Sequence, residues 1–331
     1  MQHHTWAVYV KPILRSGLAT LPIRPPVMKT VTTFHLKILR AILKLSKYSP
    51  IVPLYFLLGE LPAEASLHLD MLSLFWNAWC NPQTKAYEVI KYILKMSDTN
   101  SVTWSAHLRI ILLKYNLPDP LTLLASPPWP KEKWKQYTGT AVTCYHEKAL
   151  RQKCSKNVKL KYFNVHAVSL TGTPHPIITW LATTRDVEIA RPHIKMLAGD
   201  YPCFSYLGHD RGTDPHCRLC SCMSFQQPAE EDLMHILTRC RATAETRSRI
   251  LPDLLNLLAQ YHPNHGLLLQ HAHSTLTQLI LDCTSLNLPS SHRISPKHPL
   301  YRDIARKCSD IVYAIHKDRA QQLKNMGLLR K

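Results

Sequence analysis

Cys217-Arg218-Leu219-Cys220, followed by fourteen residues, then His235, four more residues and Cys240, forms a C-x2-C-x14-H-x4-C pattern. Three thiolates and one imidazole are a ligand set that suits a tetrahedral zinc ion. Because protein atoms fill all four positions, no coordination site remains open for water or a substrate. The pattern therefore predicts one structural Zn2+ ion, bound by Cys217, Cys220, His235 and Cys240 in a small irregular knuckle.

The residues around this pattern fit a metal site. A short helix is expected over 229–238, and its first residues, 230–232, are acidic, which suits the positive end of a helix dipole. Neighbouring arginines would help to keep the thiols ionised. These arginines are Arg218, Arg239 and Arg241. Four other side chains lie close enough in sequence to replace a ligand, and they stay open as alternatives: Cys203, His209, His216 and Cys222.

Length and composition indicate a globular protein of a reducing compartment. With 331 residues, of which 45% are hydrophobic, the chain can bury a sizeable core. No secretory signal opens the sequence, and its apolar runs are too short to cross a bilayer. Ten cysteines in such a chain favour metal ligands or free thiols over disulfides. We therefore expect an intracellular protein of the nucleus or cytoplasm that is not secreted, does not bind membranes and takes no small-molecule substrate.

The charge balance points to a polyanionic partner. The chain has 41 Lys and Arg against 22 Asp and Glu, which gives 41 − 22 = +19. Solubility does not require such an excess, which also destabilises the folded state through repulsion between like charges. Nucleic acid is the most common partner of so basic a chain, so we expect RNA, DNA or both as partners.

Periodicity predicts a mostly α-helical fold. In the segment 27–45, for example, Val31, Phe34 and Ile38 share one face, while Lys37 and Arg40 lie on the opposite side. Helices are expected over 27–45, 62–78, 83–96, 101–115, 131–161, 184–198, 243–261, 274–283 and 299–323. The helix over 184–198 should bend or break at Pro192.

Breaks in these patterns divide the chain into four predicted segments. A proline-rich connection over 118–130 separates the first from the second. The segments are a helical subdomain over 1–117, a basic helical connecting region over 118–200, the zinc knuckle over 201–260 and a C-terminal helical extension over 261–331.

Candidate nucleic-acid contacts gather in the second segment. The stretch 131–161 contains nine Lys or Arg and two acidic residues, with aromatic residues between them. Cations could contact phosphates while rings stack on bases, although Trp and Tyr in such a helix also commonly face the protein core. The predicted contact residues are Lys37, Arg40, Lys131, Lys133, Trp134, Lys135, Arg151, Lys153, Lys156 and Arg241.

The sequence lacks the common catalytic motifs. It contains no Asp-Asp pair for a two-metal polymerase site, no Gly-rich phosphate loop, no His-Glu-x-x-His and no Gly-x-Ser-x-Gly. Pairs such as Cys144 with His146, or Cys203 with His209, are expected by chance in a chain this rich in Cys and His. The chain is therefore predicted not to be an enzyme.

The zinc pattern and its continuation through 241–255 resemble the Cys/His segment near the C-terminus of non-LTR (LINE-type) retrotransposon polyproteins. Leu14-Arg15-Ser16-Gly17-Leu18 and the stretch 34–40 resemble the end of the polymerase and its thumb in that family. The stretch 55–65 and Trp129-Pro130-Lys131-Glu132-Lys133-Trp134-Lys135 resemble the region that connects the thumb to the Cys/His segment. The likeness covers most of 14–260, in the family's order. The sequence departs from that pattern at Met234, where the family often has an acidic residue.

The resemblance implies a function without catalysis. The family's whole protein nicks DNA and copies RNA into the nick, but the endonuclease and the palm aspartates have no counterpart in this sequence. What carries over is the zinc ligand set and contact with RNA or target DNA, and a retroelement polymerase acting in trans is a further partner that this origin allows. The chain is thus expected to be a non-catalytic nucleic-acid-binding fragment of such a protein. The alternative is a zinc-stabilised protein-interaction module that binds an acidic partner.

Overall fold

The computed structural model describes residues 5–96, 103–170, 172–203, 214–221, 229–261, 273–285 and 299–328. Within these ranges the fold is mostly helical and contains no strand, and the β pairing is limited to one bridge between His216 and Glu230. The prediction of a mostly α fold is confirmed. No helix in the described ranges has the length and apolar character that a membrane span requires.

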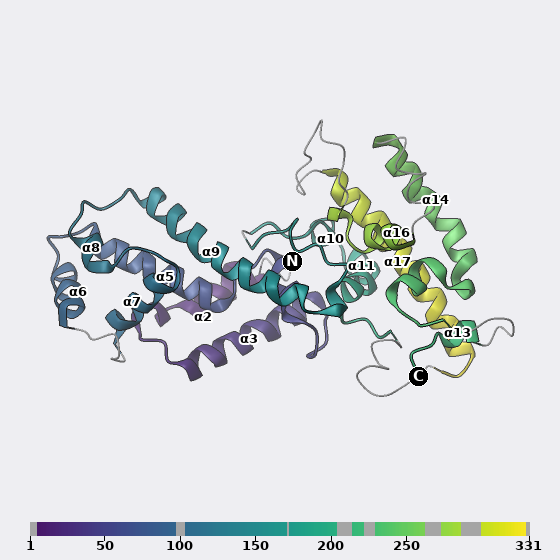
Figure 1. Ribbon diagram of the computed structural model, residues 1–331, viewed down its shortest axis with the longest axis horizontal. Helices are drawn as coiled ribbons and strands as arrows, with labels where there is room; N and C mark the ends of the chain where they lie inside the picture. Colours follow the sequence, from purple (N-terminus) through teal and green to yellow (C-terminus); the bar gives the residue numbers. More distant parts are fainter. Residues whose placement is uncertain are drawn as a thin grey trace. The chain divides into compact units, whose positions relative to one another are not determined.

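The chain divides into two compact units (Figure 1). Unit 1 comprises 1–42 and 60–152, and unit 2 comprises 43–59 and 153–331. The helices of unit 1 are η1 Trp6–Val10, α2 Lys11–Arg15, η2 Leu18–Thr20, α3 Pro25–Leu43, α5 Ala63–Trp79, α6 Lys85–Met96, α7 Trp104–Lys114, α8 Pro120–Leu124 and α9 Lys131–Ser155. The last residues of α3 and α9 belong to unit 2.

The core of unit 1 is built around α5. Apolar side chains cover more than one face of this helix, as is typical of a helix buried within a core. Leu72 and Phe75 of α5 have no exposed surface, and Trp79 is 1% exposed. Trp134 and Val142 of α9 join the same cluster. The core therefore includes a helix that the sequence predicted to be a separate basic region.

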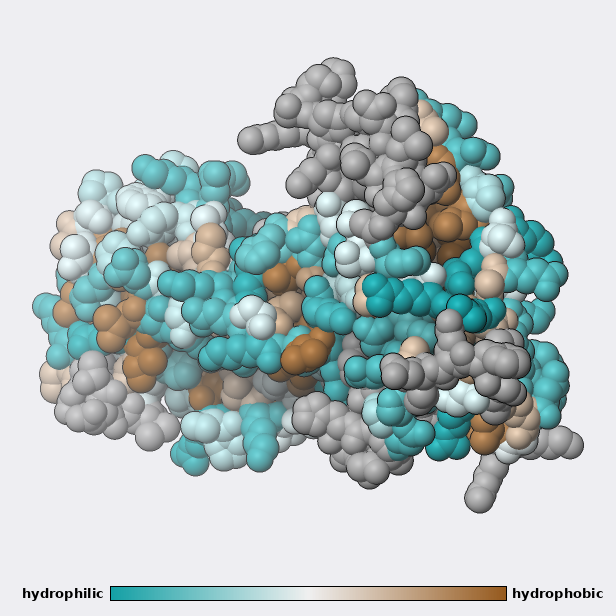
Figure 2. Space-filling model, turned by 45° about the vertical axis from the view of Figure 1, so that its right-hand side comes forward, coloured by the Kyte–Doolittle hydropathy of each residue, from teal (hydrophilic) through white to brown (hydrophobic). Residues whose placement is uncertain are grey.

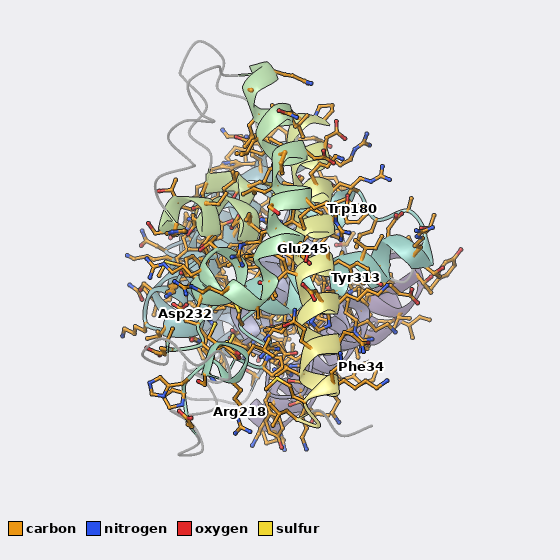
Figure 3. All side chains as sticks on the ribbon, turned by 90° about the vertical axis from the view of Figure 1, so that its right-hand side faces the viewer. Phe34, Trp180, Arg218, Asp232, Glu245 and Tyr313 are labelled. Atoms are coloured by element: carbon orange, nitrogen blue, oxygen red, sulfur yellow. The ribbon has the colours of Figure 1, made fainter. Side chains whose placement is uncertain are left out.

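Unit 2 contains η3 Val158–Leu160 and the helices α4 Ile51–Leu58, α10 Pro176–Thr179, α11 Thr184–Leu197, α13 Arg218–Ser221, η4 His235–Arg239, η5 Arg241–Thr243, α14 Ala244–Tyr261, α16 His273–Leu281, η6 Cys283–Ser285 and α17 Pro299–Asn325. Its central element is α17, which contacts α10, α11, α14 and α16. Figure 3 shows α14 and α17 side by side, marked by Glu245 and Tyr313.

Gly59 ends α4 and packs closely against the backbone at residues 172 and 173, also in unit 2. It has φ 63°, a left-handed conformation that favours glycine. A Cβ atom at this position would lie 2.8 Å from the backbone of Thr173, and the Gly59 carbonyl accepts a hydrogen bond from the Gly172 N–H at 2.9 Å. Only glycine lets these two backbones come so close.

Most predicted helices form within a few residues of their expected bounds. The helix expected over 131–161 ends at Ser155, because Asn157 caps the short helix η3. The helix expected to bend or break at Pro192 does not break there, since α11 continues from Thr184 to Leu197 with Pro192 inside it, and the bend stays a prediction. The proline-rich stretch contains α8, whose Leu123 and Leu124 are buried in the unit 1 core. The division into four segments stays a prediction.

Candidate metal centre and basic surfaces

The four predicted metal ligands come together in unit 2. The ligand atoms of Cys217, Cys220, His235 and Cys240 all lie within 4.8 Å of one another. Cys220 Sγ is 3.4 Å from His235 Nε2 and 3.7 Å from Cys240 Sγ. Tetrahedral zinc with bonds of about 2.3 Å to sulfur and about 2.0 Å to nitrogen requires separations of about 3.8 Å and about 3.5 Å. The cluster can therefore hold a metal ion of this geometry.

Backbone hydrogen bonds join the two halves of the site. The Cys217 N–H donates to Ala229 O at 2.8 Å, and the Glu231 N–H donates to Pro215 O at 2.9 Å, on either side of the His216–Glu230 bridge. These bonds place the first cysteine pair against the segment that leads to His235. Because Glu230 pairs in this bridge, the helix expected over 229–238 begins later than predicted.

A wide helical turn then sets the second pair. Asp232 accepts a hydrogen bond from the His235 N–H through Oδ1 at 2.7 Å, in the turn that leads into η4. The Cys240 N–H donates to His235 O at 2.7 Å, five residues back, as in a π-helical turn. This turn brings His235 and Cys240 to one side of the chain, facing the first pair.

Three of the four residues are buried, Cys220 is partly exposed, and the sulfur atoms shift one another's pKa. Cys217, Cys240 and His235 are 1%, 2% and 6% exposed. A hydrogen bond from the Cys217 thiol lowers the pKa of Cys240 to about 3, against the effect of burial. The same contact with Cys240, together with burial, raises the pKa of Cys217, and burial raises the pKa of Cys220. Binding of a metal ion would require all three sulfurs to lose their protons and coordinate as thiolates.

Arg247 is a cation near the site that sequence reasoning missed. Burial lowers its pKa, while the Cys240 and Cys220 sulfurs act in the opposite direction. Its Nη1 donates to Thr243 Oγ1 at 2.9 Å. A divalent ion with three thiolates leaves one net negative charge, which Arg247 is placed to balance. The helical spacing of Thr243 and Arg247, directly after Cys240, is the signal that could have found it.

The C-terminal helix α17 covers the metal site. Leu323 packs with Cys217, Leu219 and Cys240 in one apolar cluster. Gln322 Nε2 donates to Ala242 O at 2.8 Å. The site thus depends on a helix that the sequence predicted to be a separate extension.

A buried ion pair adds a second link between α17 and the knuckle. Arg319 Nη2 lies 2.6 Å from Glu231 Oε1, and the two side chains are 9% and 0% exposed. A buried pair of this kind fixes relative position, because removing either partner would leave the other charge uncompensated.

The alternative ligands do not join the described cluster. His216 Nδ1 lies 2.6 Å from Asp214 Oδ1 at the surface. Cys203 is fully buried and lies outside the group of four. Cys222 and His209 lie outside the described residues.

The predicted nucleic-acid contacts have mixed environments. Exposed members are Lys37, Lys131, Lys133, Lys135, Lys153, Lys156 and Arg241, whereas Arg40 and Arg151 are half-buried. Arg151 pairs with Glu147 at 2.9 Å. Lys37, Arg40, Arg151 and the lysines over 131–135 belong to unit 1, and the other members belong to unit 2. Figure 2 shows a mostly hydrophilic surface in which hydrophobic residues form separate groups.

Trp134 is not available for base stacking. It is 2% exposed, and its Nε1 donates to Leu72 O at 3.1 Å. Its ring lies against Trp79, with centroids 5.7 Å apart. Burial satisfies both its apolar ring and its N–H group, so the prediction of a nucleic-acid contact by Trp134 is corrected to a core role.

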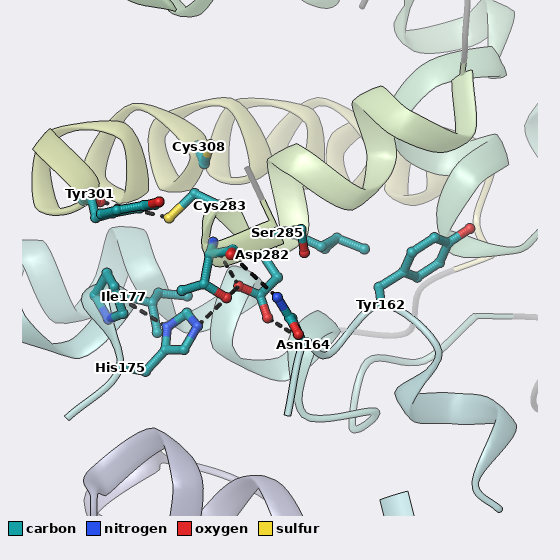
Figure 4. Close-up of polar contacts among 12 residues, drawn as sticks. Tyr162, Asn164, His175, Ile177, Asp282, Cys283, Ser285, Tyr301 and Cys308 are labelled. Atoms are coloured by element: carbon teal, nitrogen blue, oxygen red, sulfur yellow. Dashed lines mark hydrogen bonds and ion pairs between the residues drawn. The ribbon is translucent and has the colours of Figure 1, made fainter. Parts of the chain in front are cut away.

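A second polar cluster in unit 2 has a structural arrangement (Figure 4). Asp282 is fully buried and accepts hydrogen bonds from Asn164 N–H at 2.7 Å, from the Thr284 hydroxyl at 2.5 Å and from His175 Nε2 at 3.2 Å. Burial would raise the pKa of Asp282, but His175 and these hydrogen bonds lower it. Burial also raises the pKa of the adjacent Cys283 thiol. The cluster ties three chain segments together and offers no exposed nucleophile.

Among the described residues, metal coordination is therefore the clearest chemistry of a side-chain cluster. Basic side chains are exposed in both units, and they supply a second, electrostatic feature. No family model matches the chain, and neither a curated protein nor a solved structure is significantly similar to it.

Proposed function

We propose that the chain is a non-catalytic nucleic-acid-binding protein, related to the C-terminal part of a LINE-type retrotransposon polyprotein. The observation that carries this proposal is the exposure of lysines at the start of α9, in a chain with a formal charge of +19. Lys131, Lys133 and Lys135 lie within two turns of one another, with Glu132 as the acid among them. Such a group can contact successive phosphates.

In this proposal the metal is zinc, and its role is structural. Three soft thiolates and an imidazole favour zinc over hard cations such as magnesium. The four protein ligands complete a tetrahedron, so the ion has no position for a reacting group. Zinc would instead hold the 215–243 region and α17 in place within unit 2.

A salt titration of binding tests the electrostatic proposal. The purified chain should bind single-stranded and duplex oligonucleotides at low salt, with affinity that falls steeply as salt rises. Each phosphate contact contributes about 0.7 to 0.9 to the slope of log K against log salt. The absence of binding to either nucleic acid at low salt would contradict the proposal.

A triple substitution identifies the surface. Lys131→Gln with Lys133→Gln and Lys135→Gln should lower affinity and reduce the salt slope by roughly 2. The matched control removes three lysines from α6 in the same unit, by Lys85→Gln, Lys91→Gln and Lys95→Gln. Equal losses in the two triple variants would show that binding follows net charge and does not depend on the start of α9.

A second candidate function is protein interaction, and α6 is the observation that favours it. Val89, Tyr92, Ile93 and Met96 follow the spacing of one helix face and are 53%, 64%, 38% and 69% exposed. Lysines border this apolar stripe, so it fits an acidic amphipathic helix. Under this proposal Tyr92→Ser with Met96→Ser would abolish capture of a stoichiometric protein partner and leave binding of nucleic acid unchanged.

A further inference from the structure

Three aromatic rings and two lysines form one corner of unit 1. The members of this aromatic corner are Trp76, Trp129, Tyr137, Lys131 and Lys133. The Trp129 and Tyr137 ring centroids are 5.3 Å apart with planes at 67°. Lys133 Nζ lies 4.7 Å from the centroid of the Trp129 ring, and Lys131 Nζ lies 6.0 Å from that of Trp76. The ammonium groups of Lys131 and Lys133 therefore lie next to the aromatic rings.

Hydrogen bonds to the backbone fix the tryptophan rings. Trp76 Nε1 donates to Trp129 O at 2.9 Å, which ties α5 to the segment before α9. Pro128 and Pro130 flank Trp129 and restrict its backbone. The Trp129 ring also lies against the buried ring of Trp134, with centroids 6.3 Å apart. These contacts hold the tryptophan rings of the aromatic corner in place before a ligand binds, so little side-chain entropy is lost on binding.

Part of the aromatic corner is open to solvent. Tyr137 is 38% exposed, and Trp76 and Trp129 are half-buried. The lysines gain only a weak cation–π interaction at such exposed sites. That gain is small enough for a phosphate to draw either ammonium group away from its ring. Glu132 is the one acidic residue in the same turn of α9. Because Lys131 and Lys133 flank it, the turn keeps a net positive charge.

We propose that the aromatic corner binds a single-stranded segment of nucleic acid. Unstacked bases would pack on the open ring surfaces of Tyr137 and Trp129, while Lys131 and Lys133 contact the flanking phosphates. A duplex hides its base faces within the stack and cannot use the rings in this way. An acidic protein would satisfy the lysines but would gain nothing specific from the rings. This inference rests on the proposed function and adds to it a preference for single strands.

The test separates stacking from charge. Binding of a short oligothymidylate is compared with binding of an abasic strand of equal length, which has the same phosphates and no bases. The duplex of the same length serves as a third probe. Stacking of one base contributes about 1 to 3 kcal/mol, so wild-type protein should bind oligothymidylate at least about fivefold more tightly than the abasic strand. Quenching of tryptophan fluorescence should accompany binding of oligothymidylate alone.

Tyr137→Leu is the decisive variant, because it keeps an apolar side chain at a partly exposed position. It should lose most of the preference for oligothymidylate while its affinity for the abasic strand is unchanged. Tyr92→Leu is the matched control: Tyr92 is an exposed tyrosine beside lysines on α6, and the variant should behave as wild type. A circular dichroism melt of each variant checks that the fold is retained.

Each outcome decides between the two proposals. Equal binding of oligothymidylate and abasic strand by wild-type protein would overturn the stacking inference and leave the electrostatic proposal standing. The same holds if Tyr137→Leu and Tyr92→Leu are indistinguishable. Failure of wild-type protein to bind any of the three probes at low salt would overturn the proposed function itself.

Discussion

The core of unit 1 and the metal site of unit 2 hold their structures by different means. The apolar cluster of unit 1 contains 19 buried residues drawn from six of its helices and the segments between them. The cluster at the metal site contains four buried residues, and two of them are ligand cysteines. Burial of apolar surface can stabilise the first region, whereas the cluster at the cysteines buries much less of it. We therefore expect coordination of a metal ion by the four Cys and His residues to stabilise the second region.

Removal of the metal should have the largest effect and should affect the two regions unequally. Structural zinc sites contribute on the order of 10 kcal/mol of binding free energy, so a chelator or Cys217→Ser should unfold the region from α13 to η5. Unit 1 should stay folded. Six of the seven tryptophans lie in unit 1 and only Trp180 lies in unit 2, so fluorescence reports on unit 1 while limited proteolysis reports cleavage within 214–243.

Cys144→Ser is the matched control, since Cys144 is an exposed free cysteine on α9. It should leave both the metal content and the proteolysis pattern unchanged. Elemental analysis should find one zinc per chain in the wild type and in this control. Resistance of 214–243 to proteolysis after complete metal removal would show that the two regions do not differ as described.

Removal of an aromatic ring from the core should destabilise unit 1 and leave the metal site of unit 2 intact. Phe75→Ala empties a fully buried position in α5 and should lower the free energy of unfolding of unit 1 by about 3 to 5 kcal/mol. Phe34→Ala removes the same atoms from a side chain that is 45% exposed, and its cost should stay below about 1 kcal/mol. Urea unfolding followed by tryptophan fluorescence measures both. Loss of bound metal in Phe75→Ala would contradict the separation of the two regions.

Acid should destabilise unit 1 through its buried histidines. Burial lowers the pKa of His68 to about 3 and that of His35 to about 4. An unfolded histidine takes up a proton near pH 6.5, so below that pH the unfolded chain binds more protons than the folded one. Stability is therefore full above pH 6.5 and falls as pH decreases, by about 2 kcal/mol per histidine at pH 5.

The measurement is urea unfolding at pH 7 and pH 5 with tryptophan fluorescence as the signal. His68 Nδ1 lies 2.6 Å from the Tyr115 hydroxyl, and His68→Asn keeps a polar atom near that position. The variant should lose about 2 kcal/mol of the difference between the two pH values. An unchanged difference would indicate that His68 does not remain neutral when folded.

The sequence was sufficient to predict the features of the fold and of the site that depend on local spacing. The grouping of Cys217, Cys220, His235 and Cys240, the mostly α fold and most helix bounds agree with the prediction, because helix periodicity and ligand spacing are properties of short segments. The capped ends of α11 and the turn at Cys240 lie close to their expected positions.

What the sequence missed depends on contacts between distant residues. Trp134 was predicted to contact nucleic acid because it lies among lysines, but its partner Leu72 is 62 residues away. Spacing alone does not tell which aromatic residue of a basic helix faces the core. The cover that α17 gives to the metal site and the pairing of Arg319 with Glu231, 88 residues apart, were also beyond local reasoning.

The position of Leu323 and Gln322 over the metal site has a consequence for biosynthesis. Gln322 is separated from its contact Ala242 by 80 residues, which a ribosome adds in roughly 4 to 16 s. During that interval the four Cys and His residues have been synthesised, but the end of α17 that covers them has not. Binding of a metal ion by the nascent chain would protect the cysteines from oxidation until α17 has been synthesised, so we expect the supply of that metal during translation to govern the yield of intact protein.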